Sequence, residues 1–427
     1  MDVFEQLESE VRSYCRGWPV VFDRAVGSRL WDVDQNSYLD FFSGAGALNY
    51  GHNNPAVKKP LLEYLGADRV IHSLDMSTVA KAEFLQAFQR TILGPRGLDY
   101  KVQFPGPTGT NAVEAALKLA RKVTGREHVV SFTNAFHGMT LGALSVTGNS
   151  MKRNGAGVPL NHGTALPYCG FLGDDVDSMD ILEALLIGSG SGLDEPAAVI
   201  LETVQGEGGI NVASPRWLRR VAEVCERHGI LLIVDDIQMG CGRTGTFFSF
   251  EEAGIVPDIV TLSKSLSGSG LPLAVTLFKR ELDVWSPGEH NGTFRGNNPA
   301  FVTATAALEF WRDDALTQDV LAKGETVRGF LDALAAEYDG YGIEVRGRGL
   351  IWGLAFDDSE VARRICQEAF ARGLLVETSG PESEVVKLMP PLTVSVDDEL
   401  KPGLAILGEA VDATLNVEVP VVAGGAR

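Results

Sequence analysis

A lysine and an aspartate each close a short apolar segment of the chain. Lys264 lies at the end of Asp258-Ile-Val-Thr-Leu-Ser-Lys264, and Asp235 ends the run Ile230-Leu-Leu-Ile-Val-Asp235. A lysine amine in a dry site, or near other cations, can be neutral enough to attack a carbonyl. A carboxylate can keep a heterocyclic nitrogen protonated. Taken singly, Lys264 is more typical of a loop lysine and Asp235 of a strand-end cap, so the pair needs a third part.

A turn rich in glycine and threonine supplies that third part. The segment Phe104-Pro-Gly-Pro-Thr-Gly109 and Thr110 run directly into a helix-forming stretch that reaches Arg121. The N-terminus of a helix offers free N–H groups and partial positive charge to a phosphate. An ordinary helix capped by Thr108 or Thr110 explains the turn nearly as well, and its spacing matches neither common nucleotide-binding loop. Together, however, the amine, carboxylate and turn match the aldehyde, ring nitrogen and phosphate of pyridoxal phosphate.

The composition excludes several classes of protein. The net charge of -19 argues against nucleic acid or an anionic membrane as a partner and favours small-molecule substrates. Five widely spaced cysteines without a C-x-x-C pair indicate neither a disulfide framework nor a zinc ribbon, which fits a reducing cytoplasm. The seven histidines form no ligand cluster, so no metal site is expected. We predict no export signal and no membrane-spanning segment.

The middle of the chain alternates helical and strand-like segments. Helices are expected at 110–123 and 215–228, between apolar runs of the length of buried strands. This rhythm is typical of an α/β fold, in which helices cover both faces of a mostly parallel sheet. The expected strands are 128–132, 197–201, 230–234 and 259–262.

The two ends of the chain differ from the middle. The first residues predict a helix at 4–14 and short strands near 20–22, 29–32 and 38–42. After Arg312 we expect a long helix, strands at 342–346 and 350–356, a helix at 360–371 and a strand at 374–377. We therefore predict a large domain at 55–312 and a smaller α+β domain built from residues 1–54 and 313–427. Gly188-Ser-Gly-Ser-Gly192 is expected to be a surface loop.

Three motifs resemble those of the class III (ω-amino acid type) aminotransferases, which have pyridoxal phosphate fold type I. They are Asp235-Asp-Ile-Gln238-Met-Gly-Cys-Gly-Arg243-Thr-Gly245, Ser263-Lys264 and Glu202-Thr-Val-Gln-Gly-Glu207. The resemblance covers nearly the whole chain. It implies a large domain with a mostly parallel seven-stranded sheet, a smaller α+β domain, and Lys264 and Asp235 as the catalytic pair.

The family resemblance also implies the contacts of the cofactor, pyridoxal 5'-phosphate. Gly109 and Thr110 would hold its phosphate, Phe136 would stack on its ring, and Gln238 would bond its 3-oxygen. His137 is placed among the cofactor contacts too, although packing or hydrogen bonding beside a turn glycine is the more usual role of such a histidine. Thr293 would reach the phosphate of the neighbouring subunit, which implies a homodimer or a higher homo-oligomer.

Within the family, three further segments resemble the ectoine-pathway diaminobutyrate–2-oxoglutarate transaminases. They are Glu10–Cys15, Gly44–Pro55 and Leu74–Lys81. This resemblance implies transfer of the amino group of L-glutamate to L-aspartate 4-semialdehyde, giving L-2,4-diaminobutyrate and 2-oxoglutarate. Lys264 would move the proton from the α-carbon of glutamate.

Both substrates carry carboxylates, so the site should contain fixed cations. Many family members have arginine where this chain has Met139 and Lys387. In those members the second arginine pairs with the residue matching Glu207, which moves aside for an α-carboxylate. The expected substrate contacts are therefore Glu207, with Lys387 as a looser partner, and Tyr50.

For two other residues near these motifs the sequence predicts no definite role in the site. Glu202 could be a carboxylate behind the site or a solubilising residue at a strand end. Arg243 is expected to anchor its own turn rather than to bind substrate.

Other functions fit parts of the pattern. The same enzyme type could supply diaminobutyrate for a peptide antibiotic or a siderophore, and a related ω-transaminase could take another acceptor. A protein of a different class, an inactive regulator or scaffold with the cofactor fold, is also conceivable. The intact Lys264, Asp235 and Gln238 count against that reading.

Overall fold

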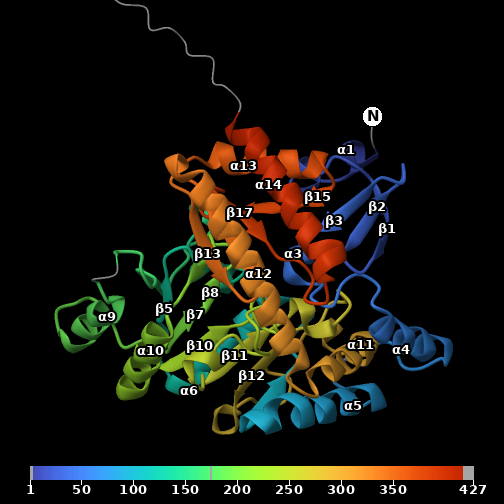
Figure 1. Ribbon diagram of the computed structural model, residues 1–427. Coiled ribbons are helices and arrows are strands. Elements are labelled where there is room, and N and C mark those ends of the chain that lie inside the picture. The colour runs from blue at the N-terminus through green and yellow to red at the C-terminus, as the bar shows by residue number, and fades with distance from the viewer. Residues whose placement is uncertain (1–2, 174–175, 417–427) are drawn as a thin grey trace, which may run out of the picture.

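A seven-stranded sheet forms the centre of the molecule (Figure 1). The computed structural model describes residues 3–173 and 176–416. The strand order is β4-β12-β11-β10-β7-β5-β6, and the neighbours from β11 to β6 all run parallel. Strand β12 is antiparallel to both of its neighbours. The strands are β4 (Tyr100–Gln103), β5 (Val129–Phe132), β6 (Gly163–Leu166), β7 (Ala198–Leu201), β10 (Leu231–Asp235), β11 (Ile259–Leu262) and β12 (Val275–Lys279).

The predicted segments of the middle of the chain form the elements expected of them. Strands β5, β7 and β11 consist entirely of buried residues, as apolar strands of a parallel sheet covered on both faces should. Helices α6 (Gly109–Thr124) and α10 (Pro215–His228) pack on the sheet. Both end at a left-handed glycine, Gly125 and Gly229, so their C-terminal boundaries are encoded locally.

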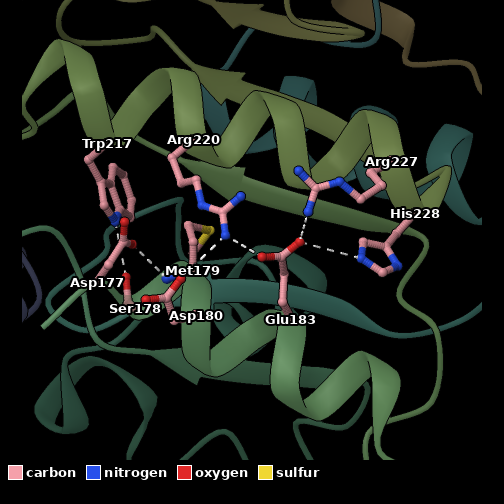
Figure 2. Close-up of polar contacts among 9 residues, drawn as sticks. All are labelled: Asp177, Ser178, Met179, Asp180, Glu183, Trp217, Arg220, Arg227 and His228. Carbon is pink, nitrogen blue, oxygen red and sulfur yellow. Dashed lines mark hydrogen bonds and ion pairs between the residues drawn. The ribbon is translucent and has the colours of Figure 1, made fainter.

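Helix α9 (Ser178–Ile187) is held against α10 by charged side chains (Figure 2). Glu183 on α9 forms ion pairs with Arg220 and Arg227 of α10, and its Oε1 lies 3.8 Å from His228 Nε2. At the other end of the contact, Trp217 Nε1 donates a hydrogen bond of 3.0 Å to Ser178 Oγ. These contacts join two helices that are separated in sequence by residues 188–214.

Strands from both ends of the chain pair in one sheet. The antiparallel strands β1 (Phe22–Val26), β2 (Arg29–Asp32) and β3 (Ser37–Asp40) are joined by β15 (Leu374–Leu375), which runs parallel to β3. The blue N-terminal strands and the red C-terminal elements lie together at the top of Figure 1. The smaller α+β part is thus built from both termini, as predicted, while the boundaries at 54 and 312 stay predictions.

A second antiparallel sheet contains only C-terminal strands. Its order is β13-β14-β17-β16, and helix α12 (Ala315–Glu337) runs from this part of the molecule down to the central sheet in Figure 1. The strands are β13 (Glu344–Arg348), β14 (Ile351–Ala355), β16 (Glu377–Ser379) and β17 (Val385–Leu388). A two-stranded ladder of β8 (Val204–Gln205) and β9 (Asn211–Val212) lies beside it.

The remaining α-helices connect and cover these sheets. In residues 3–173 and 176–416, no helix is long and apolar enough to cross a membrane. The remaining α-helices are α1 (Val3–Leu7), α2 (Tyr14–Gly17), α3 (Ser43–Gly46), α4 (Pro55–Gly66), α5 (Val79–Phe88), α7 (Leu141–Ser145), α8 (Ser150–Arg153), α11 (Asn298–Leu308), α13 (Ser359–Ala371) and α14 (Lys401–Leu415).

Two predictions of local structure were wrong. The expected helix at 4–14 is interrupted after Leu7, where Ser9 Oγ accepts a hydrogen bond from the Val11 N–H and so competes with helical bonding. The expected single strand at 374–377 is divided between two sheets, because β15 pairs with β3 whereas Glu377 pairs with Lys387 of β17. That division brings Glu377 next to the residues described below.

Candidate active site

A cavity of about 270 Å³ lies where the carboxyl ends of β10 and β11 meet the N-terminus of α6. The ends of parallel strands share one edge of a sheet, and ligands of open α/β sheets bind there. Most of the residues predicted for the site line this cavity. They are Gly109, Thr110, Phe136, His137, Glu207, Asp235, Gln238 and Lys264.

Lys264 presents an amine that is poised to react. It follows β11 in the left-handed region, with φ of 46°, a conformation that a lysine rarely adopts. Within the described residues its Nζ has no hydrogen bond or ion pair. Burial lowers the pKa of Lys264, and the positive charge of Lys387 acts in the same direction against the opposing charge of Glu207. The amine is therefore more often neutral than that of a surface lysine, as a nucleophile or base must be.

Asp235 is a buried carboxylate fixed on both oxygens. Its Oδ1 accepts hydrogen bonds from Thr261 Oγ1 at 3.0 Å and from the Ile237 N–H at 3.2 Å. Its Oδ2 lies 2.8 Å from His137 Nδ1. Burial alone would lower the pKa of His137, but the hydrogen bond and charge of Asp235 raise it above its usual value. His137 thus serves to orient the carboxylate from behind, which matches the hydrogen-bonding role considered above.

The N-terminus of α6 forms an anion cradle. The backbone N–H groups of Gly109 and Thr110, in the first turn, donate no hydrogen bond within the described chain. A Cβ at Gly109 would lie 3.0 Å from Ile237 Cδ1, so the missing side chain lets the helix end approach the segment after β10. Thr110 Oγ1 lies 2.7 Å from Thr140 Oγ1 and adds a hydroxyl beside the free N–H groups.

Gln238 offers an unused polar atom to the same cavity. Its Nε2 donates to Ala45 O at 3.0 Å and to Glu207 Oε1 at 3.1 Å, whereas its Oε1 is buried without a partner among the described residues. Gly206 makes room for this amide, because a Cβ there would overlap it. An amine, a fixed carboxylate, an anion cradle and an orphaned amide oxygen around one small cavity fit pyridoxal 5'-phosphate.

A buried lysine is shared by two glutamates at the edge of the cavity. Lys387 Nζ lies 2.8 Å from Glu207 Oε1 and 2.8 Å from Glu377 Oε1, and its side chain is 0% exposed. Burial opposes ionisation of Glu207, but Lys387 and then Lys264 hold the pKa of its carboxyl far below the usual range. Burial raises the pKa of Glu377, and Lys387 only partly offsets this.

Comparison with known proteins places the chain in a family. The model of the family "Aminotransferase class-III" matches residues 13–411. The chain belongs to the class III aminotransferases. The "Diaminobutyrate--2-oxoglutarate transaminase" of Streptomyces coelicolor is 64% identical to it over 97% of this chain and 98% of that protein. The protein of the same name from Halalkalibacterium halodurans is 60% identical, over 98% of each chain.

Solved structures agree with this assignment. The ornithine aminotransferase of Toxoplasma gondii superposes on this class III aminotransferase with a TM-score of 0.83 at 28% identity, covering 96% of this chain and 93% of that one. The predicted family, fold type I and use of pyridoxal 5'-phosphate by a transaminase are therefore confirmed.

Three predicted site residues of this class III aminotransferase lie away from the cavity. Tyr50 is buried, accepts a hydrogen bond of 2.8 Å from Trp311 Nε1 and stacks on Phe310, so its side chain belongs to the core. Thr293 is exposed on the surface, where its carbonyl lies 2.7 Å from His72 Nε2. Lys387 reaches the cavity only through Glu207.

Two carboxylates of the site were missed or left open by the sequence. Glu377 belonged to an expected strand and gave no signal of its own, because its contact with Lys387 depends on the pairing of β16 with β17. Glu202 lines the cavity, is 6% exposed, and its Oε1 accepts a hydrogen bond of 2.9 Å from the Phe136 N–H. Of the two roles considered for Glu202, this position favours a carboxylate at the site over a solubilising residue at a strand end.

Arg243 is fully buried and donates to Leu350 O, Pro390 O and Asn49 Oδ1, so the anchor prediction is confirmed.

Proposed function

We propose that this class III aminotransferase transfers the amino group of L-glutamate to L-aspartate 4-semialdehyde. The products are L-2,4-diaminobutyrate and 2-oxoglutarate, and the pathway is ectoine synthesis. The names of relatives at 60 to 64% identity over nearly the full length support this substrate pair.

The Lys387 ammonium, which Glu207 separates from the cavity, carries the proposal. L-Glutamate brings a carboxylate on the reacting carbon, whereas the aldehyde carbon of the semialdehyde carries only hydrogen. A site that serves both must offer a cation to one substrate and hide it from the other. The Glu207–Lys387 pair meets this requirement, because Glu207 neutralises Lys387 until an α-carboxylate displaces it.

The chain's own groups divide the remaining work. Bound pyridoxal 5'-phosphate supplies the aldehyde and the electron-withdrawing ring. Lys264 Nζ would take the proton from the α-carbon of glutamate, and in the second half-reaction it would deliver a proton to the former aldehyde carbon of the semialdehyde. Asp235 would keep the ring nitrogen protonated, and the Gly109 and Thr110 N–H groups would hold the phosphate. Phe136 would stack on the ring, and Gln238 would contact its 3-oxygen.

A two-step experiment tests this function. Purified enzyme with bound cofactor is mixed with L-glutamate alone, and the visible absorbance is followed until it bleaches. L-Aspartate 4-semialdehyde is then added, and the product is identified by mass spectrometry. We expect bleaching, recovery and L-2,4-diaminobutyrate, and none of these with Lys264→Ala. Bleaching without recovery would refute the acceptor, and turnover by Lys264→Ala would refute the mechanism.

We also propose a homodimer in which Thr293 reaches the neighbouring site. An exposed apolar surface surrounds this residue, formed by Phe294 at 65%, Met76 at 58% and Val79 at 68% exposure. The two segments lie together, since Ser73 N donates to Gly296 O at 3.0 Å and His72 packs on Phe294. Apolar surface of this kind is typical of a contact between subunits.

A further inference from the structure

The two proposed substrates share a feature that one cation could recognise. In L-glutamate the distal carboxyl carbon lies three bonds from the carbon that loses nitrogen. In L-aspartate 4-semialdehyde the carboxyl carbon also lies three bonds from the carbon that gains it. Both substrates react at Lys264 if the proposed function is right. Each then has a carboxylate three bonds from the carbon that reacts there.

A larger groove of about 1060 Å³ continues outward from the cofactor cavity, and Phe136 and Glu207 line both. Three cations line this groove. Arg16 is paired with Glu10 through Nη2, and its Nε donates to the Arg12 carbonyl at 3.0 Å. Arg363 is held by Glu360, with one hydrogen bond of 2.8 Å.

Lys152 is the third cation, and its ammonium has no acceptor in residues 3–173 and 176–416. Within the described residues its Nζ forms no ion pair or hydrogen bond, and it lies 5.2 Å from the centroid of the Phe136 ring. Its backbone is fixed at the start of α8, where the Lys152 N–H donates to Asn149 Oδ1 at 3.1 Å. A cation over a ring face keeps its N–H groups available to a carboxylate.

Other residues near the cavity cannot replace it. Met139 lines the cavity but carries no charge. Lys387 is 0% exposed and already neutralised by two carboxylates. We propose that Lys152 binds the distal carboxylate of L-glutamate and the carboxylate of L-aspartate 4-semialdehyde, and so selects substrates with this spacing.

The test compares ligands with and without the distal carboxylate. Binding of glutarate and of pentanoate to the enzyme with bound cofactor is measured at equilibrium by calorimetry, without turnover. Bleaching is then measured with L-glutamate and with L-norvaline, in which a methyl group replaces the distal carboxylate. The variants are Lys152→Met, Lys152→Arg and, as a matched control on the same helix, Arg153→Met.

Loss of a charge-assisted hydrogen bond should weaken glutarate and L-glutamate by about tenfold or more in Lys152→Met. Pentanoate and L-norvaline should be unchanged, Lys152→Arg should retain most of the preference, and Arg153→Met should behave as the unmodified enzyme. Equal effects on both members of each pair, or unchanged glutarate binding, would overturn the proposal. Because glutarate binding needs no acceptor, this result is independent of whether diaminobutyrate is formed.

Discussion

The amine of Lys264 works beside a cluster in which two glutamates share one buried lysine. Burying an ion is costly unless it is paired, and Lys387 is paired twice. A lysine is a compact charge, so both carboxylates meet at the same Nζ, whereas an arginine would present a fork. In the exchange proposed above, Glu377 stays 2.8 Å from Lys387 while an α-carboxylate takes the place of Glu207.

Glu202 gives a prediction on pH. Burial raises the pKa of its carboxyl to about 8, from 4.5 for an ordinary glutamate. Between these values the folded chain holds one proton more than the unfolded chain, so this residue makes stability fall as pH rises. Glutamine resembles the protonated form. We expect Glu202→Gln to unfold at nearly the same temperature as the unmodified enzyme at pH 5, and roughly 2 °C or more above it at pH 9.

Thermal unfolding from pH 5 to pH 9 checks this expectation. The difference between the two proteins should grow as pH rises from 4.5 to about 8 and should stay constant above about 8. Parallel curves would mean that Glu202 is ionised at neutral pH in the folded chain.

At the scale of elements, the site is assembled from strand ends and one helix start. Lys264 and Asp235 were predictable because each follows a short apolar run, and parallel runs end at one edge of a sheet. Gly109 and Thr110 were predictable from the turn before α6. Glu377 and Lys152 were not predictable, since one depends on the pairing of β16 with β17 and the other on the position of the Lys152 ammonium over the Phe136 ring.

The contact between α9 and α10 yields a prediction of local stability. Glu183 is largely buried and pairs with Arg220 and Arg227 across the two helices, as in Figure 2. Glu183→Ala should destabilise the contact by about 1–2 kcal/mol. Amide hydrogen exchange should speed up in α9, measured by mass spectrometry of its peptides.

Glu223→Ala is the matched control, because Glu223 is an exposed glutamate on α10. Amide hydrogen exchange of α9 in Glu223→Ala should equal that in the unmodified enzyme. Unchanged exchange of α9 in Glu183→Ala would show that the ion pairs contribute nothing to holding this helix.

At the scale of the whole molecule, the alternation of helices and strands predicted the central sheet and its covering helices. It did not predict how the strands of the smaller part are shared between sheets. The central sheet follows from apolar runs at regular spacing, so its parallel strands could be read from sequence. The switch of residues 374–377 from one sheet to another could not, because it is set by which edges are vacant once the chain has folded.

The apolar surface around Phe294 predicts an effect on assembly. A charge placed in a subunit contact must be desolvated on association, so Phe294→Glu should weaken or abolish the dimer. Light scattering after size-exclusion chromatography measures the mass of each form. Ile187→Glu, at an exposed apolar position on α9, should leave the mass unchanged. A dimer of unaltered strength in Phe294→Glu would place the contact elsewhere.

The pairing of β3 with β15 also has a consequence for synthesis on the ribosome. The Phe41 N–H donates to Leu375 O at 3.0 Å, and its carbonyl accepts from Met389 N at 2.7 Å. Residues 39–41 leave the ribosome long before these partners are made. Until then their backbone N–H and C=O groups on this edge are unpaired, and the apolar side chains of Leu39 and Phe41 are exposed. The nascent chain therefore exposes an unpaired strand edge with apolar side chains until residues 374–389 emerge from the ribosome. During this period we expect a chaperone to bind the chain most readily.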